Sequence, residues 1–514
     1  MTRGAWAIAL AAFLTFAVTG GGRIVGSDEV TMFSLARAMI HGGIAVPEGA
    51  TLQGPDGRFY SKNTAGQAVL ALPLVAIGDA AAATAGFADE RRELAARFVA
   101  SFFNAVVAAL LLAALFEALR RMRVRVGAAF AATVLCGFTT PFWVYAKSFM
   151  AEPLEALGLL LALTGAARAG AAAAPADVRH GERTAALGAF LAISAKLGVA
   201  PLAVACLGAA GLKRPRVWLW PLAGVALALA GHALYNAARF GTPFETGYGA
   251  QASASAFTTP LLVGVYGLLL SSGKGVAWFA PVILLAPWGV AAMVRSRQHS
   301  DAARRGDDVR RAGVAIVAAW AIGLFLYGRF QHWGGDGSWG PRYLVPLLPL
   351  AFLAVGFALD GASRLRRRLA AGLAVAGLVV TLGGVGIHFG AEMREVGDYP
   401  YTLALDDPHF MEASHWNPRF TPIVGHWRML SRNLAEHLRG EAPVLGAHGV
   451  PDPRTGISVE EQRTLLHAID VWWLYAGYAG IPRLPLFAAA VLLAIGAVLA
   501  WVYAWRMARA GAAT

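Results

Sequence analysis

The residues of this chain with the greatest potential for chemistry are charged side chains near the ends of apolar stretches. Asp28 and Glu29 follow the first apolar stretch, Lys62 lies in the polar segment after it, and Glu152 stands at the start of another apolar stretch. A carboxylate can accept a proton from a reacting group, and a lysine can counter negative charge that develops in a transition state. Three carboxylates and a lysine on one face of the molecule would therefore form a candidate catalytic centre.

The same carboxylates have a simpler structural explanation. Ser27 can cap a helix that begins at this point, and Asp28 and Glu29 would then lie in its first turn, where negative charge complements the helix dipole. Glu152 precedes Pro153 and could cap another helix in the same way. The sequence leaves both explanations open, so the elements that position these residues matter.

The composition indicates that these elements are membrane-spanning helices. Of 514 residues, 57% are hydrophobic and 15% are charged, and many apolar runs reach the ~20 residues that cross a bilayer as a helix. The runs are rich in Ala and Leu and do not alternate with polar residues, which predicts an all-α polytopic membrane protein. Cys136 and Cys206 both fall in apolar runs, so neither a disulfide framework nor a thiolate zinc site is expected.

The arginines predict the orientation of these helices. A net charge of +13 would suggest a nucleic-acid partner in a soluble protein. In this chain the arginines cluster between apolar runs, where they favour a cytoplasmic location. The clusters lie at residues 120–125, 213–216, 295–311 and 364–368. We therefore place these segments in the cytoplasm and expect no nucleic-acid partner.

With this orientation, residues 66–87 cannot form a full span, because the cluster at 120–125 would then face outward. We predict that residues 66–87 lie at the outer surface as juxtamembrane helices, broken near Pro73 and Gly78. A further apolar run is split at Lys196 into two short spans, and one long span is the alternative. The resulting prediction is about twelve spans with both termini in the cytoplasm: 4–22, 96–119, 126–146, 152–170, 184–197, 199–212, 217–238, 276–294, 312–330, 341–359, 370–390 and 484–506.

Polar residues collect in the segments that this topology places outside. These segments are residues 23–95, 146–156, 239–275, 328–343 and 391–483. We therefore expect any chemistry on the outer face. The predicted organisation is a transmembrane catalytic region over 1–390, an extracytoplasmic segment over 391–483, and a last transmembrane helix with a cytoplasmic tail over 484–514.

The order and sidedness of several short motifs resemble the GT-C superfamily of integral membrane glycosyltransferases, which use a polyprenyl-phosphate sugar. The motifs are "DE" after the first span, "RFYSKNTAGQAVLALP", "YAKSFMAEPLEAL", "ISAKLGVAPLA" and "SWGPRYLVPLLPL". The layout looks most like the branch that contains protein O-mannosyltransferases and the lipid A aminoarabinose transferase, and it covers most of residues 1–360. The chain lacks the Lys-Pro-Pro run of the latter enzyme after Lys62, so the acceptor is not carried over.

The resemblance implies roles for the charged residues. The aspartate that acts as catalytic base in the first outer loop of that family maps to Asp28, with Glu29 beside it, and a second acidic residue maps to Glu152. The basic residues that hold the lipid phosphate map to three positions, Lys62, Lys196 and Arg342. One base opposite the leaving group implies inversion at the anomeric carbon, whereas two carboxylates could support a retaining double displacement.

Two of these basic residues have alternative explanations. Arg342 stands at the outer end of a span, where an arginine can simply extend to the interface. Lys196 lies inside an apolar run, where an unpaired charge costs ~2.5–3.5 kcal/mol on insertion scales. The predicted split of that run brings Lys196 to the outer boundary, and a functional role is the default hypothesis for such a residue.

Further residues are candidates to line a substrate or lipid site. Trp339 and Tyr343 flank the arginine motif and could line the lipid entrance, although Trp and Tyr also form ordinary interfacial belts. Tyr60 lies close to the lysine of the first outer loop, and Glu245 and Tyr248 lie in the outer loop 239–275. These five residues complete the predicted site.

The sequence implies no firm cofactor. His332 and Asp336 could suggest a metal, but two residues without a third ligand at a firm spacing make a poor site, so a divalent cation stays an open possibility. Nucleotide-binding glycine motifs are absent where they would matter, so a cytosolic sugar nucleotide is not expected as direct donor. The expected partners are a polyprenyl-phosphate-linked sugar donor, a lipid, glycan or protein acceptor, and membrane lipids.

The resulting hypothesis is glycosyl transfer from a polyprenyl-phosphate sugar to an acceptor hydroxyl on the outer face, with Asp28 as general base. The alternatives are a transporter or flippase of a lipid-linked glycan, which would place charges deep within spans, and a scaffold with an inactive catalytic fold. Alanine richness and the family resemblance favour the bacterial inner membrane, with the active site on the periplasmic face.

Sidedness is the first testable prediction. A reporter fused after residue 90 should report an extracytoplasmic location, because residues 23–95 form the predicted first outer loop. Alkaline phosphatase and green fluorescent protein fusions measure this directly, and a fusion within residues 295–311 is the matched cytoplasmic control. A cytoplasmic signal after residue 90 would remove Asp28 from the proposed centre.

Overall fold

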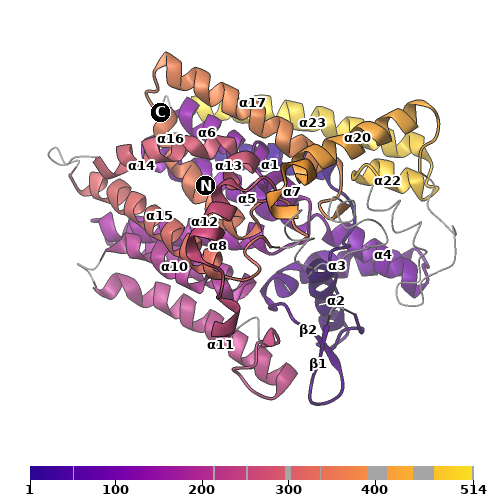
Figure 1. Ribbon diagram of the computed structural model, residues 1–514. Coiled ribbons are helices and arrows are strands. Elements are labelled where there is room, and N and C mark those ends of the chain that lie inside the picture. Colours follow the sequence, from indigo (N-terminus) through magenta and orange to yellow (C-terminus); the bar gives the residue numbers. More distant parts are fainter. Residues whose placement is uncertain are drawn as a thin grey trace.

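The computed structural model describes residues 1–49, 51–211, 215–249, 253–295, 303–335, 337–391, 414–443 and 468–511 (Figure 1). The structure is 75% helical. The first half contains α1 (Arg3–Thr19), α2 (Ser27–Ile40), β1 (Thr51–Gln53), β2 (Phe59–Ser61), α3 (Gly66–Thr84), α4 (Asp89–Ala100), α5 (Phe103–Arg121), α6 (Val126–Phe138), α7 (Phe142–Ala146), α8 (Glu152–Ala171), α9 (Pro175–Ala195), α10 (Ala200–Leu207) and α11 (Leu219–Phe240). The second half contains α12 (Leu261–Leu270), α13 (Val276–Phe279), α14 (Ala286–Arg295), α15 (Ala303–Arg329), the 3₁₀ helix η8 (Arg342–Leu347), α16 (Leu348–Leu359), α17 (Arg364–Gly386), α20 (Pro422–Leu438), α22 (Trp472–Tyr478) and α23 (Arg483–Ala510).

The helical membrane class predicted from the sequence is confirmed, with one antiparallel hairpin, β1–β2, added. Within the described residues, eight helical stretches are long and apolar enough to cross a membrane. They are Gly66–Thr84, Arg91–Arg121, Glu152–Ala171, Arg216–Phe240, Asp308–Arg329, Arg342–Leu359, Arg364–Gly386 and Arg483–Ala510. Other predicted spans correspond to shorter apolar helices such as α1 and α6, so the count of about twelve is not confirmed.

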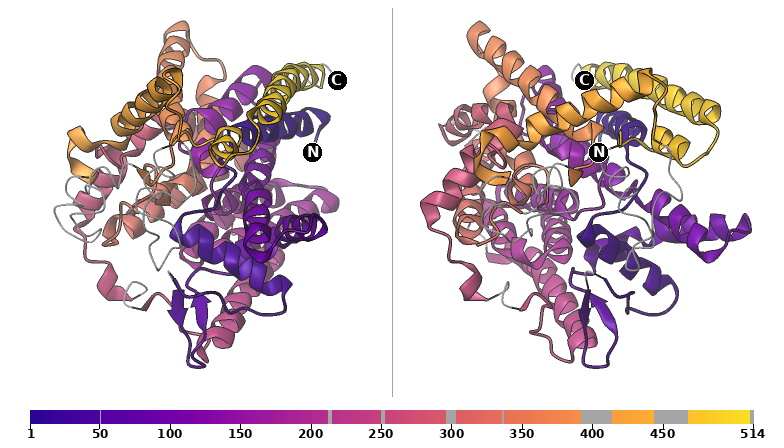
Figure 2. Two further views of the ribbon diagram at one scale, coloured as in Figure 1. Left: turned by 90° about the vertical axis from the view of Figure 1, so that its right-hand side faces the viewer. Right: turned by 45° about the vertical axis from the view of Figure 1, so that its right-hand side comes forward.

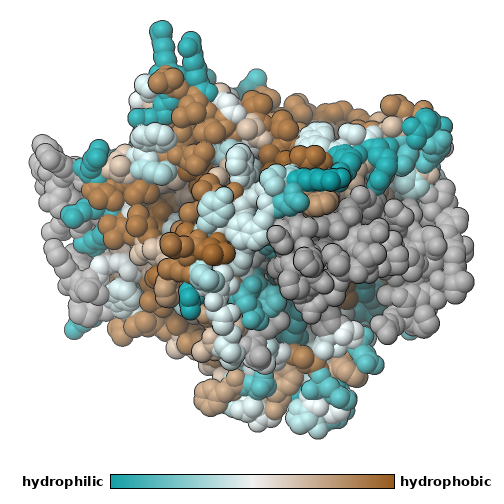
Figure 3. Space-filling view, in the orientation of Figure 1, coloured by the Kyte–Doolittle hydropathy of each residue, from teal (hydrophilic) through white to brown (hydrophobic). Residues whose placement is uncertain are grey.

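The surface of the helices fits contact with lipid. On α23, Leu484 is 80% exposed and Leu492 is 69% exposed, and so much apolar surface on a helix indicates an apolar surrounding. Figure 3 shows hydrophobic residues over the region of α12, α15 and α17 and hydrophilic residues along α20. The two termini lie near each other (Figure 2), because α1 packs along α23.

The predicted break of the apolar run at Lys196 is present. Helix α9 ends at Ala195, Lys196 is extended with φ −161° and ψ 122°, and α10 begins at Ala200 after one 3₁₀ turn. The extended residue therefore separates two helices and places the lysine at a helix end instead of in the middle of a long span.

The predicted break of residues 66–87 near Pro73 and Gly78 is wrong, because α3 is one continuous helix with Pro73 inside it. Gly78 is the position where α3 crosses α4, and a Cβ there would collide with the backbone of Ala96. The glycine therefore permits close helix packing and does not end the helix.

The contacts of α3 bear on whether it crosses the membrane. At its start, the hydroxyl of Thr64 donates to the carbonyl of Ala195, 2.5 Å away, at the end of α9. At its other end, a short turn leads to α4, which begins the 31-residue stretch Arg91–Arg121. The helical stretch is interrupted between α4 and α5, at Ser101 and Phe102. Helix α3 is itself long and apolar enough to cross a membrane, so the surface position of residues 66–87 stays a prediction.

Helices α8 and α9 form a close pair that supports the start of α8. Gly158 and Gly165 on α8 face the backbone of α9, and Gly181 and Gly188 on α9 face the backbone of α8. Small residues allow two membrane helices to approach closely, so that van der Waals contact replaces the hydrophobic effect as the source of association. This pair positions Glu152 relative to Lys196.

Replacement of Gly188 by Leu should destabilise the protein, because a Cβ at this position would already collide with the backbone of Ala162. Overpacking costs about 1–3 kcal/mol, and a backbone collision leaves little room for relief. Thermal melting in detergent would measure the loss. Gly231→Leu is the matched control, since a Cβ at Gly231 on α11 meets no atom within 4 Å. Equal melting temperatures for the two variants would contradict the packing argument.

Candidate active site

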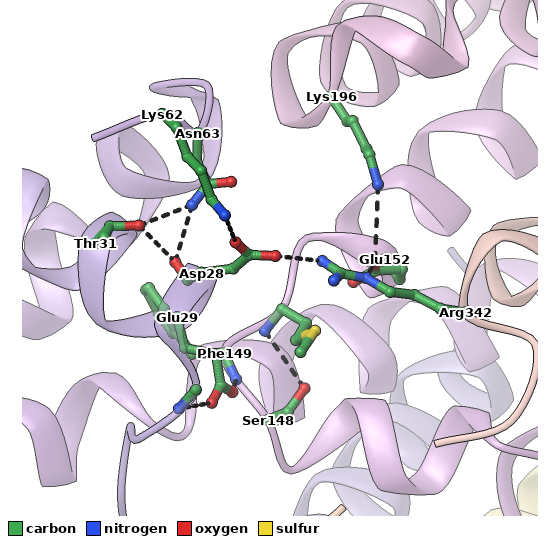
Figure 4. A network of polar contacts seen from close by, with 12 residues as sticks. Asp28, Glu29, Thr31, Lys62, Asn63, Ser148, Phe149, Glu152, Lys196 and Arg342 are labelled. Atoms are coloured by element: carbon green, nitrogen blue, oxygen red, sulfur yellow. Dashed lines mark hydrogen bonds and ion pairs between the residues drawn. The ribbon is translucent and has the colours of Figure 1, made fainter. Parts of the chain in front are cut away.

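The side chain of Arg342 joins the two predicted carboxylates (Figure 4). Its Nη2 lies 2.9 Å from Oδ2 of Asp28, and its Nε lies 2.5 Å from Oε1 of Glu152. Lys62 approaches the other oxygen of Asp28, with Nζ 3.2 Å from Oδ1. The Nζ of Lys196 lies 4.0 Å from Oε1 of Glu152. Five predicted residues from distant parts of the chain therefore form one network of charges.

Local structure explains the positions of four of these residues. Asp28 lies in the first turn of α2, Lys62 directly follows β2, and Lys196 occupies the break after α9. Arg342 begins η8 after a turn in which Gly335 and Gly340 have φ values of 68° and 61°, a conformation that glycine adopts without steric cost.

The predicted cap of α2 is wrong in one respect. The N-cap residue is Gly26, and Ser27 is already part of the helix. The backbone N–H of Gly26 donates to Oε2 of Glu29 at 2.8 Å, so the carboxylate of Glu29 satisfies a free donor at the helix start.

A cavity of about 460 Å³ lies beside this network. Its charged lining residues are Asp28, Lys62, Lys196, Arg239 and Arg342, and Glu152 lies behind Arg342. Cations therefore outnumber carboxylates, which suits an anionic ligand. The volume falls in the usual range for small-molecule sites, about 300–1,000 Å³.

The state of Asp28 follows from its surroundings. Burial would raise the pKa of Asp28, but the positive charges of Arg342 and Lys62 outweigh burial and hold that pKa well below its usual value. The carboxylate is therefore ionised at neutral pH and able to accept a proton. Asp28 lines the cavity, so a bound hydroxyl group could reach it.

Glu29 lies on the other side of α2. Its side chain is buried, and its Oε1 accepts a hydrogen bond from the backbone N–H of Phe149 at 2.5 Å. Burial raises the pKa of Glu29, and the hydrogen bonds from Phe149 and Gly26 oppose this effect. Glu29 is not among the residues that line the 460 Å³ cavity, so the structure separates it from Asp28.

Two of the five predicted lining residues reach the cavity. Tyr343 lies there with its ring stacked on Tyr327, the centroids 4.7 Å apart and the planes at 9°. The ammonium group of Lys196 lies over the ring of Tyr343, with Nζ 4.8 Å from the ring centroid. Tyr248 also lines the cavity, and its hydroxyl donates to Oδ1 of Asn63 at 3.1 Å.

The other three predicted lining residues lie elsewhere. Tyr60 donates to Oδ2 of Asp56 at 2.6 Å within its own hairpin. Trp339 is fully buried against Phe279, with ring centroids 5.1 Å apart. Glu245 accepts from a backbone N–H within its own loop. None of these three side chains lines the described cavity, so their predicted lining role is not supported.

Helix α11 supplies one wall that the sequence analysis did not predict. His232, Asn236 and Arg239 line the cavity, and their spacing of four and three residues places them on one helix face. Nη2 of Arg239 donates to Oδ1 of Asn236 at 2.6 Å, and its guanidinium lies 4.0 Å from the Tyr235 centroid. Three polar residues at helical spacing in an otherwise apolar helix were the signal that could have identified this wall.

Within the described residues, no group of three or more His, Cys, Asp or Glu side chains could hold a metal ion. His332 lines the cavity, whereas Asp336, the other residue considered for a metal in the sequence, lies outside the described residues. Much of the predicted extracytoplasmic segment 391–483 also lies outside them.

Comparison with known proteins gives a structural similarity without a sequence match. No family model matches the chain, and no curated protein matches it. The chain is similar to ArnT. In the crystal structure of ArnT from Cupriavidus metallidurans bound to undecaprenyl phosphate, 15% of residues are identical, the TM-score is 0.49, and the match covers 96% of this chain and 77% of ArnT. The apo structure gives 15% identity, a TM-score of 0.48, and coverage of 93% and 76%.

At this identity and these TM-scores the similarity assigns no activity to the chain. The case for a function of this chain depends on the charged network and the cavity beside it.

The charge network predicts how Lys62→Met affects Asp28. The pKa of Asp28 should rise, because burial still disfavours the carboxylate and one opposing cation is gone. Infrared difference titration of the carboxylate band, with Asp28→Asn to assign it, would locate the change. Arg58→Met is the control, since Arg58 pairs with Asp56 and its side chain is 73% exposed. An unchanged titration of Asp28 in Lys62→Met would contradict the electrostatic argument.

Proposed function

We propose that this protein is a membrane glycosyltransferase that moves a sugar from a polyprenyl-phosphate donor to an acceptor hydroxyl group. The observation that carries this proposal is the ion pairing of Arg342 with Asp28 and Glu152 beside a cavity that two lysines also line. A base for the acceptor and an anion site for the leaving group thus occur within one cavity.

The proposed reaction uses Asp28 as general base. Asp28 takes the proton of the acceptor hydroxyl while the hydroxyl oxygen bonds to the anomeric carbon of the sugar. The bond between that carbon and the phosphate oxygen breaks, and its electron pair stays on the phosphate. The products are the glycosylated acceptor, the polyprenyl phosphate and a protonated Asp28, which returns its proton to solvent.

The cations have different proposed tasks. Lys62 and Lys196 have side chains that are 33% and 27% exposed, whereas the Arg342 side chain is 16% exposed and already pairs with two carboxylates. We therefore assign direct contact with the donor phosphate to the two lysines. Arg342 orients the carboxylates and adds positive charge that stabilises the departing phosphate.

The position of Glu152 supports inversion at the anomeric carbon. Its side chain is 1% exposed and is not among the residues that line the cavity. A retaining double displacement needs a second carboxylate as nucleophile at the sugar, and Glu152 lies behind Arg342 instead. Glu152 in this proposal holds Arg342 and Lys196 in place.

The distribution of charges supports an enzyme over a transporter or flippase of a lipid-linked glycan. The site lies at the start of α8 and immediately before α16, whereas the ends of these helices lie near the basic clusters: Arg168 pairs with Asp177, and Arg125 pairs with Asp360. A transporter would need charged groups along a path through the membrane. The positive-inside rule supports a location of the site on the outer face, which would be the periplasmic face in a bacterial inner membrane.

Undecaprenyl phosphate, with which ArnT was crystallised, is the probe for the donor site. The wild-type protein should bind it, and Lys62→Met/Lys196→Met should lose this binding, measured by scintillation proximity or thermal shift. Asp28→Asn should keep the binding but lose transfer from undecaprenyl-phosphate sugars by about 10²–10⁴-fold, because the general base is gone.

Arg58→Met is again the control for loss of a cation outside the cavity. Absence of undecaprenyl phosphate binding in the wild type, or full transfer by Asp28→Asn, would overturn the proposed function.

A further inference from the structure

A buried polar cluster lies on the side of α2 opposite the 460 Å³ cavity. Its centre is Asp470, which follows a part of the chain outside the described residues. Oδ1 of Asp470 lies 2.7 Å from Nε of Arg23, and Oδ2 lies 3.0 Å from Nζ of Lys147. All three side chains are at most 8% exposed, so these ion pairs are shielded from solvent and sensitive to loss of a partner.

The chain around Asp470 is attached to two other parts of the fold. Its backbone N–H donates to the carbonyl of Gly386 at the end of α17, 2.8 Å away. The indole N–H groups of Trp472 and Trp473 donate to the carbonyls of Ala17 and Val18, 2.9 and 3.0 Å away, in the last turn of α1. The segment 468–473 is therefore fixed between the ends of α1 and α17.

Lys147 connects this segment to the loop before α8. Besides Asp470, its Nζ donates to the carbonyl of Val385 at 2.6 Å. The loop then runs from Lys147 to Ala151, and Glu152 is the first residue of α8. The position of Glu152 is thus linked to Asp470 through five residues of backbone.

Each residue between Lys147 and Ala151 is held by a side chain or backbone group from elsewhere. The amide of Asn104 donates to the carbonyls of Ser148 and Met150 at 2.8 and 2.7 Å. The amide of Gln67 donates to the carbonyl of Phe149 at 2.5 Å, and Glu29 accepts from the Phe149 N–H. The loop is therefore held at several points, and its charged partners in these contacts are Glu29 and Asp470.

Glu29 couples this loop to Asp28. The two carboxylates are neighbours in the chain but face different cavities: Asp28 lines the large cavity, and Glu29 lines a small chamber with Arg23, Lys147 and Asp470. The chamber holds space for about one water molecule, about 10 Å³. A shift of the loop would therefore move Glu152 and, through Glu29, the helix turn that carries Asp28.

We propose that Asp470 is a positioning residue of the active site, which acts through Lys147 and the loop 147–151 to set the distance between Glu152 and Asp28. The expected effect on catalysis rests on the proposed function. A carboxylate base works only when it is placed within a fraction of an ångström of its productive position, and a displacement of about 1 Å can cost about 100-fold in rate.

The charges of the cluster support a role for the ion pairs themselves. Burial would raise the pKa of Asp470, but Arg23 and Lys147 outweigh burial and lower it, so Asp470 is ionised. Burial and the charge of Arg23 lower the pKa of His388, which also lines the chamber, to about 3. The imidazole is therefore neutral and does not replace either cation as a partner of Asp470.

The test compares Asp470→Asn with the double variant Asp470→Asn/Lys147→Gln. The single variant leaves buried Lys147 without its charged partner, so it should melt at a lower temperature. The double variant removes one charge of each sign and should recover most of this melting temperature, but the link between the segment and the loop stays broken. The matched control is Arg125→Gln/Asp360→Asn. This double variant removes an ion pair between two residues that are distant in the chain and lie at the helix ends far from the site.

Two measurements separate positioning from mere stability. In the double variant, hydrogen exchange of a peptide covering 147–151 should be about 10-fold faster than in the wild type, because its backbone bonds open more often. Transfer from an undecaprenyl-phosphate sugar should show kcat lower by about 10- to 100-fold with KM within about twofold. The control pair should change neither quantity.

The outcomes distinguish this inference from the proposed function. Wild-type exchange rates in the double variant, or recovery of kcat together with the melting temperature, would overturn the positioning role. If the wild type neither binds undecaprenyl phosphate nor transfers sugar, the proposed function fails, and the exchange measurement alone still decides whether Asp470 holds the loop. Faster exchange in the double variant but not in the control pair then supports the structural link.

Discussion

The structure of the site depends on the ion pairs that Arg342 makes with Asp28 and Glu152, 2.9 and 2.5 Å away. A buried charge without a partner is costly, and a guanidinium group can satisfy two carboxylates at once because its donors lie in a rigid plane. Arg342 therefore holds together α2, α8 and η8, three elements that are far apart in the sequence. The side chains of Lys62 and Lys196 add to the same network from two further segments.

Close packing of the surrounding helices fixes the positions of the residues in this network. Glycines along α8 and α9 bring the two backbones together, which fixes Glu152 and Lys196 at adjacent helix ends. Helix α11 places His232, Asn236 and Arg239 against the opposite side of the cavity. The result is a site in which Arg342 is held by the scaffold, while Lys62 and Lys196 keep part of their surface open to a ligand.

A second layer of polar contacts supports the first. Glu29, Asn104 and Gln67 satisfy the backbone of the loop before α8, and Asp470 anchors that loop through Lys147. Buried polar groups need hydrogen-bonding partners in a low-dielectric interior, so these contacts restrict where the loop can lie. This layer joins the segment 468–473 to the chain between α1 and α2, which lies more than 400 residues earlier, as the Arg23–Asp470 pair shows.

The sequence by itself determined the membrane class and the helix break at Lys196, because apolar runs and the charges that interrupt them are local features with a high energetic cost if misplaced. The five charged residues of the network were identified from short motifs whose order resembles a known family. The sequence did not determine that Asp28 and Glu29 face different chambers, since adjacent helix residues diverge by about 100° and only the packing partners decide which one meets the cavity. Neither Trp339 nor Glu245 is among the residues that line the described cavity, since the type of an aromatic or acidic residue beside a motif does not determine where its side chain points. The α11 wall and the Asp470 anchor depend on contacts between distant segments, and only the tertiary structure could decide those.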